Sequence, residues 1–198
     1  MSLLRAFALL LFAFLVVPAA AAAQSPTGGS EFAPPPPPPP EAEDMTVPGV
    51  KTQLLPDGTA AAPADAPVEV QQAVWAANRI QDKPYKYGGG HAKIEDSGYD
   101  CSGTVSYALH HAELLETPLD SGSFMRWGAK GRGAWITVFT NPGHAYAVIA
   151  GLRLDTSSAG VSTRRGTRVA RSALERGPRW RPTWRSAKGF RARHPLGL

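Results

Sequence analysis

Three residues with chemically active side chains are spaced so that one fold could bring them together: Cys101, His144 and Asp155. Cys101 is the only cysteine among the 198 residues. A thiol beside an imidazole can ionise near neutral pH and attack a carbonyl carbon, and a carboxylate can orient the imidazole. The sequence therefore predicts a nucleophilic site, provided that the surrounding elements position these three side chains.

The residues around Cys101 have the pattern of a helix start. Asp100 is a residue type that caps helices, and Gly103 would let another backbone approach closely. In the first helical turn, unpaired amides and the helix dipole favour the thiolate form of Cys101. We expect a helix over residues 101–115 with one apolar side. That side consists of Val105, Ala108, Leu109, Ala112 and Leu115.

The chain changes to a β pattern after residue 134. Residues 135–139, 144–150 and 152–155 are rich in β-branched, aromatic and other apolar residues, and glycine-containing turns separate them. Residues 190–193 have the character of a last strand. These segments predict a meander of antiparallel strands.

His144 opens the second of these strands. Because side chains alternate along a strand, His144, Tyr146 and Val148 share one face. If the Cys101 helix packs on that face, its thiol meets the imidazole of His144. Asp155 ends the next strand, where its carboxylate could reach the same imidazole.

The sequence alone does not decide which residue joins Cys101 and His144 as the third member of the site. Asp155 could orient His144, or it could only form an ion pair with Arg153 or Arg191. His194 follows the last predicted strand and is the alternative third residue.

A first helix precedes all of these elements. Apolar residues recur at helical spacing between 70 and 80, with Pro67 placed to start the helix and Pro84 to end it. Helices therefore come first and antiparallel strands follow. This order predicts an α+β fold.

The N-terminal third has a different composition. Residues 1–23 have a basic start, an apolar core and a small-residue exit, which predicts a secretory signal peptide. An uncleaved membrane anchor is the alternative, because residues 6–23 are about long enough to cross a bilayer. Residues 24–66 contain seven consecutive prolines, at 34–40, and predict a disordered Pro/Ala-rich linker. Residues 67–198 then form a single folded domain outside the cytoplasm.

The basic excess lies in the C-terminal region. From residue 153 onward there are twelve Lys and Arg residues against two acidic ones, Asp155 and Glu175. Such a region attracts polyanions, although a solvated basic face without a specific partner is an alternative. We do not expect nucleic acid as the partner of an exported protein. One cysteine cannot form a disulfide within its own chain, which favours a reactive thiol.

Three segments together resemble the NlpC-type cysteine peptidases, a family of bacterial cell-wall endopeptidases. These segments are 84–89 (PYKYGG), 100–103 (DCSG) and 143–149 (GHAYAVI). The resemblance implies a papain-like fold in which the nucleophile helix packs on an antiparallel β-sheet. It also implies a location that is secreted, periplasmic or associated with the bacterial cell wall.

The implied reaction is hydrolysis of an amide bond in the stem peptides of peptidoglycan, commonly the bond from γ-D-glutamate to a diamino acid. Cys101 would be the nucleophile and His144 its base and then its acid. Asp155 stands where the family places the residue that orients the histidine.

The resemblance also implies a substrate cleft bordered by Tyr85, Asp100 and Ser102, with Asp100 holding the free amine at the start of the stem peptide. We expect a monomer without metal or cofactor, whose basic C-terminal region could bind anionic wall polymers. Two alternatives stay open: an amidase or acyl transferase that uses the same site, and a non-catalytic module that binds the wall.

Overall fold

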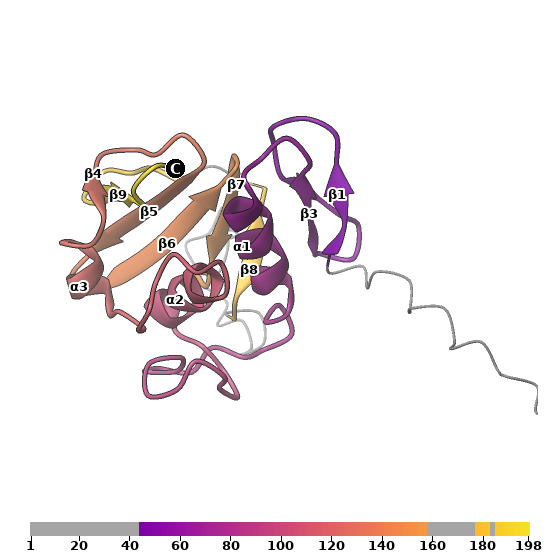
Figure 1. The fold of residues 1–198 in the computed structure, drawn as a ribbon. Coiled ribbons are helices and arrows are strands. Elements are labelled where there is room, and N and C mark those ends of the chain that lie inside the picture. Colours follow the sequence, from indigo (N-terminus) through magenta and orange to yellow (C-terminus); the bar gives the residue numbers. More distant parts are fainter. Residues whose placement is uncertain (1–43, 158–176, 183–184) are drawn as a thin grey trace, which may run out of the picture. The chain divides into compact units, whose positions relative to one another are not determined.

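The computed structural model describes residues 44–157, 177–182 and 185–198. The predicted signal peptide at 1–23 lies outside the described residues, as do residues 24–43 of the predicted linker. Two helices, α1 (Val68–Asn78) and α2 (Cys101–His111), pack against one face of a β-sheet (Figure 1). The first helix matches its predicted position.

The sheet contains six strands in the order β4-β9-β5-β6-β7-β8, and each neighbouring pair is antiparallel. The short helix α3 (Ser121–Phe124) precedes it. The predicted α+β class is confirmed. The strands are β4 (Ala129–Lys130), β5 (Ile136–Asn141), β6 (His144–Ile149), β7 (Leu152–Asp155), β8 (Arg179–Arg181) and β9 (Arg191–His194).

The face of β6 that meets the helices differs from the predicted one. Ala145, Ala147 and Ile149 join Val105 and Leu109 of α2 in the buried core. The expectation that α2 packs on the face of the alternate residues, which begins with His144, is therefore wrong. Small alanine side chains let α2 approach the sheet closely, whereas the aromatic ring at position 146 would hold it away.

The helix that begins at Cys101 is shorter than predicted. It ends at His111 and not at residue 115. Glu113 has a φ of 58°, which a continuing right-handed helix cannot contain. The amide of Leu114 then donates to the carbonyl of Leu109 at 2.9 Å and closes the helix end.

The predicted disordered linker is wrong for its C-terminal part. Residues 46–63 hold three short strands in the order β1-β3-β2, namely β1 (Thr46–Val47), β2 (Gln53–Leu54) and β3 (Ala60–Pro63). Ala60 and Ala62 belong to the same buried core as α1. The residues of β3 do not alternate between apolar and polar types, so the sequence does not mark a strand there, yet their small side chains fill the narrow space beside a helix.

Gly103 fixes how closely the loop before α2 approaches the helix. A Cβ at this position would overlap the carbonyl oxygen of Gly89. That carbonyl accepts a hydrogen bond from the amide of Asp100 at 3.3 Å, so the contact belongs to the start of α2.

We therefore predict that Gly103→Ala lowers the free energy of unfolding by about 1–3 kcal/mol, because the added methyl group forces the two backbones apart. Gly143→Ala is the control, since its added Cβ would have its nearest neighbour at 3.9 Å. Its effect should stay within about 0.5 kcal/mol. Chemical denaturation followed by circular dichroism measures both, and equal effects would contradict the close approach.

Candidate active site

The start of α2 is capped as the sequence predicts. The carboxylate of Asp100 accepts a hydrogen bond from the amide of Gly103 at 2.7 Å. Cys101 is the first residue of the helix and is partly buried. Its thiol therefore lies in the first turn, close to the unpaired amides and the positive end of the helix dipole.

Cys101 lies beside His144 where β6 begins, at one end of the sheet. The two side chains do not approach each other through the sheet face that α2 covers. The imidazole of His144 and the backbone amide of Ala145 lie close enough to the thiol to affect its ionisation. Burial alone would raise the pKa of the Cys101 thiol. These two groups outweigh burial and hold this pKa below its ordinary value.

Asp155 reaches the other side of the same imidazole. Its Oδ1 lies 3.0 Å from Nε2 of His144, and its side chain is 0% exposed. Burial alone would lower the pKa of His144, but hydrogen bonds with Asp155 and Cys101 raise it to about 9. Burial alone would raise the pKa of Asp155, but the bonds from His144 and Ser157 lower it to about 2.

These shifts have one consequence for the protonation state. Between the lowered pKa of Cys101 and about pH 9, the favoured pair is a thiolate beside an imidazolium. Nε2 of His144 is engaged with Asp155, which leaves Nδ1 to exchange a proton with Cys101. Such a pair can attack an electrophilic carbonyl carbon and then protonate the leaving group.

Asp155 has further partners. Arg185 donates to its Oδ2 at 3.0 Å, and Arg153 lies 3.5 Å from the same atom. The predicted ion pair with Arg153 therefore exists beside the contact with His144. The alternative third residue, His194, lies on β9, where its Nδ1 is 3.2 Å from the carbonyl oxygen of Gly131. Of these two residues, the structure brings Asp155 to His144.

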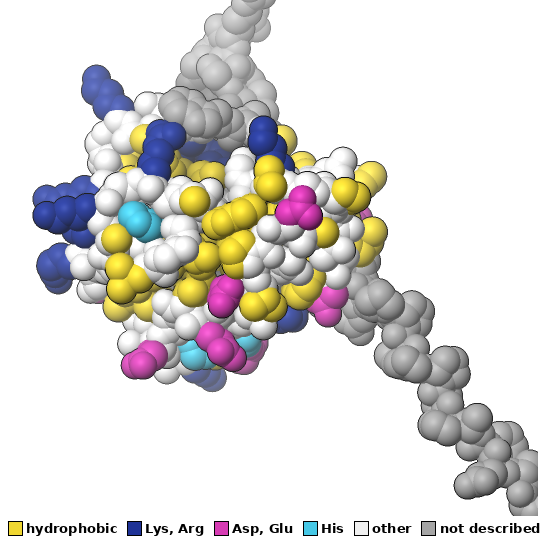
Figure 2. All heavy atoms as spheres, turned by 45° about the horizontal axis from the view of Figure 1, so that its top comes forward, with side chains coloured by type: hydrophobic (Ala, Val, Ile, Leu, Met, Phe, Trp, Pro, Cys, Tyr) yellow, Lys and Arg dark blue, Asp and Glu magenta, His cyan; other side chains and the backbone are white. Residues whose placement is uncertain are grey.

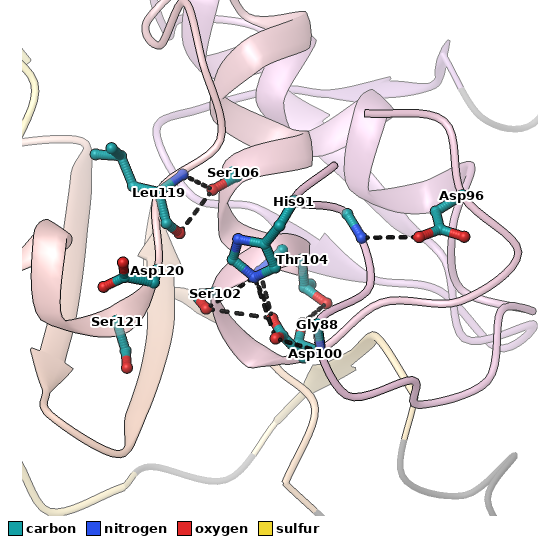
Figure 3. Close-up of polar contacts among 12 residues, drawn as sticks. Gly88, His91, Asp96, Asp100, Ser102, Thr104, Ser106, Leu119, Asp120 and Ser121 are labelled. Atoms are coloured by element: carbon teal, nitrogen blue, oxygen red, sulfur yellow. Dashed lines mark hydrogen bonds and ion pairs between the residues drawn. The ribbon is translucent and has the colours of Figure 1, made fainter. Parts of the chain in front are cut away.

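A second polar group lies beside Cys101, and sequence reasoning missed its central residue, His91. The ring of His91 points toward Asp100 and Ser102 (Figure 3). Its Nε2 lies 2.9 Å and 3.1 Å from the two carboxylate oxygens of Asp100 and 3.3 Å from Oγ of Ser102. The glycines at 88–90, which permit a tight loop back to the helix, are the one sequence signal for this contact.

Of the three residues predicted to border the substrate cleft, Asp100 and Ser102 belong to this polar group and Tyr85 lies in the segment before it. The Asp100 carboxylate accepts from four groups: His91, Ser102 and the backbone amides of Gly88 and Gly103. Ser102 is buried and Asp100 is 8% exposed. Tyr85 is partly buried and its backbone pairs with Tyr99 in an isolated parallel bridge, immediately before α2.

Two comparisons with known proteins find no relatives. No protein-family model matches the chain, and a search of curated proteins finds no significant match. Within the described residues, no group of three or more His, Cys, Asp or Glu side chains could hold a metal ion. In the same part of the chain, no helix combines the length and apolar character needed to cross a membrane.

We predict that iodoacetamide alkylates Cys101 at a pH below that at which an ordinary cysteine reacts, near 8.5. Asp155→Asn should move the alkylation profile to higher pH. Loss of the negative charge lowers the pKa of His144, and a less protonated imidazole raises the pKa of the thiol.

Asp82→Asn is the matched control, because it makes the same substitution at an exposed position. It should leave the profile unchanged. A native profile with the inflection of a free thiol, or one that Asp155→Asn does not move, would contradict the coupling between these three residues.

Proposed function

We propose that the protein is a thiol hydrolase with a papain-like, NlpC-type fold that cleaves an amide bond in the stem peptides of peptidoglycan. The observation that carries the proposal is the hydrogen bond between His144 and Asp155 beside a thiol at a capped helix start, whose pKa the imidazole of His144 lowers. The resemblance of residues 84–89, 100–103 and 143–149 to the cell-wall peptidases supplies the substrate class.

The reaction follows from these contacts. The Cys101 thiolate attacks the amide carbonyl carbon and forms a covalent bond to it, while the carbonyl electrons move onto oxygen. The backbone amide of Cys101 at the helix start is a donor for that oxyanion, a contribution of about 3 kcal/mol in comparable sites. The C–N bond breaks as His144 gives its proton to the leaving amine. Water, deprotonated by His144, then hydrolyses the thioester.

Asp155 serves both steps as a positioning residue. Its carboxylate is buried and bonded to Nε2 of His144, so the ring keeps one orientation while its charge changes. The bonds from Arg185 and Ser157 hold the carboxylate in place. A carboxylate with a pKa of about 2 stays ionised throughout the pH range in which the imidazolium forms.

The charge distribution agrees with an anionic surface as partner. On the face shown in Figure 2, Lys and Arg side chains gather on the side of β4 and β9, and Asp and Glu side chains gather on the opposite and lower parts. An enzyme with one basic side would bind an anionic wall polymer in a preferred orientation. A secreted or periplasmic location, as residues 1–23 predict, belongs to this proposal.

The proposal predicts that Cys101→Ala reduces cleavage of purified muropeptides by at least about 10³-fold, because the nucleophile is lost. Mass spectrometry of the products should show a free carboxylate on D-glutamate and a free amine on the diamino acid. His194→Ala, which alters a histidine on β9 bonded to Gly131, is the control and should retain activity.

Undiminished cleavage by Cys101→Ala would overturn the proposed mechanism. Failure of the native protein to cleave any stem-peptide bond would overturn the hydrolase assignment. Products cut between the lactyl group and alanine would identify an amidase, and products joined to an added amine would identify an acyl transferase.

The resemblance gives Asp100 a role in binding a free amine, and the structure adds a condition. Because the carboxylate already accepts from four groups, a ligand amine must displace a donor or join them, and His91 is the more exposed of the two side-chain donors. Its side chain is 24% exposed.

We predict that acetylation of the substrate's N-terminal amine lowers kcat/KM for the native protein by about tenfold, and that Asp100→Asn abolishes this discrimination. Asparagine still caps α2, so the helix start is retained. Asp57→Asn, in the exposed turn between β2 and β3, is the control and should keep the discrimination. Equal discrimination by the two variants would remove Asp100 from amine recognition.

A further inference from the structure

Arg185 brings a third charged group to the pair formed by His144 and Asp155. Its Nη1 donates to Oδ2 of Asp155 at 3.0 Å and to Oγ of Ser157 at 2.8 Å. The same nitrogen lies 3.4 Å from Nε2 of His144. Because the two oxygens take both hydrogens of Nη1, the approach to a protonated imidazole is a contact between two cations. A guanidinium group keeps its charge throughout the pH range of catalysis.

Two aromatic rings hold this guanidinium group in place. Its Cζ lies 5.3 Å from the ring centroid of Tyr146 and 5.3 Å from that of Phe190. The two rings meet edge to face at 5.2 Å, and the ring of His144 lies 6.2 Å from Phe190. Arg185 also lines a cavity of about 310 Å³ on the sheet face opposite α1 and α2. The position of its charge is therefore set by packing and does not depend on the protonation state of His144.

The carboxylate of Asp155 serves more than one cation. Arg185 and Arg153 lie 3.0 Å and 3.5 Å from its Oδ2, and His144 contacts its Oδ1. A cation close to the imidazole disfavours the imidazolium, because like charges repel. Arg185 therefore lowers the proton affinity of His144, while the contact with Asp155 keeps the ring in its orientation.

The two steps of the proposed reaction place different demands on His144. In the first step Cys101 is a thiolate, and its negative charge is among the causes that raise the pKa of His144. Formation of the thioester removes that charge. His144 must then take a proton from water, which only the neutral imidazole can do. A buried carboxylate alone favours the imidazolium, so this step gains from a fixed cation beside the ring.

We propose that Arg185 is a positioning residue that keeps His144 neutral in the thioester intermediate, so that the imidazole can act as the base for water. In this step a proton of water passes to His144 and the water oxygen bonds to the thioester carbon. The C–S bond then breaks and returns the Cys101 thiolate. The inference rests on the proposed function for the step that it serves, but the effect of Arg185 on His144 is measured without hydrolysis.

Other ionisable groups on the elements around this ring stay the same when Arg185 is replaced. Tyr146, on the same strand as His144, stays neutral because burial raises its pKa. The thioester leaves no charge on Cys101. The remaining groups are Arg153 on β7 and the carboxylates that cap α2 and α3, Asp100 and Asp120.

The test is an NMR titration of the full chain with an uncharged methylthio cap on Cys101. Methyl methanethiosulfonate adds this cap to the single cysteine, and the cap stands for the acyl group of the intermediate. Loss of one imidazole signal in His144→Gln assigns His144. Arg185→Gln should raise the proton affinity of His144 at least about tenfold, because the neighbouring cation is lost.

Two further variants serve as controls. Arg185→Lys keeps the positive charge and should change the proton affinity of His144 less than about threefold. Arg191→Gln removes the same charge from an exposed position on β9 and should leave the proton affinity unchanged.

Hydrolysis gives a second readout. At pH 7, Arg185→Gln should slow deacylation at least about tenfold more than acylation, so that the acyl-enzyme accumulates after an initial burst. Raising the pH should restore deacylation, because the imidazole then loses its proton. Loss of activity that no pH restores would indicate a merely structural role and contradict the proposal.

The sign of the change decides between the two roles. If Arg185 only held Asp155 in place, its loss would lower the proton affinity of His144; a decrease, no change, or an equal increase in Arg191→Gln would overturn the proposal. Thermal unfolding checks each variant. Arg185→Met, which keeps an unbranched chain between the two rings, decides the matter if Arg185→Gln does not fold.

The two proposals fail in different ways. A protein that cleaves no muropeptide but shows the tenfold change would contradict the proposed function and keep the control of the His144 charge by Arg185. Cleavage together with an unchanged proton affinity in Arg185→Gln would contradict the role of Arg185 and leave the proposed function standing.

Discussion

The contact between His144 and Asp155 is the interaction on which the site depends. Asp155 is fully shielded from water, and a buried carboxylate is stable only when charged or donating partners surround it. The pairing of β6 with β7 brings the two residues together, and bonds from Arg185 and Ser157 complete the environment of the carboxylate. The imidazole then stays protonated up to about pH 9, which in turn favours the thiolate of Cys101.

Small residues make the remaining geometry possible. Ala145 and Ala147 allow α2 to lie close to the sheet, and Gly103 allows the loop at Gly89 to lie against the start of the same helix. The helix is thus held from two sides. Its first residue, Cys101, meets the end of β6, where the imidazole of His144 and the amide of Ala145 both reach the sulfur.

Arg185 connects the group around His144 with the cavity on the other face of the sheet. It bonds to Asp155 and lies 3.4 Å from Nε2 of His144, and it also lines the cavity over Tyr146. Within the described part of the chain, Arg153, Arg181 and Arg185 form part of a cavity that no sequence pattern marks.

The sequence by itself determined the local features: the capped helix at Cys101, the first helix, the strand that His144 opens, and the α+β order. These follow from capping residues, apolar spacing and turns, which act over a few residues. The tertiary structure decided which face of β6 meets α2, that Asp155 and not His194 reaches His144, and that Ala60 and Ala62 are buried. It also placed His91 at Asp100. Each of these outcomes depends on strand order and packing between distant segments, and local spacing has no information about either.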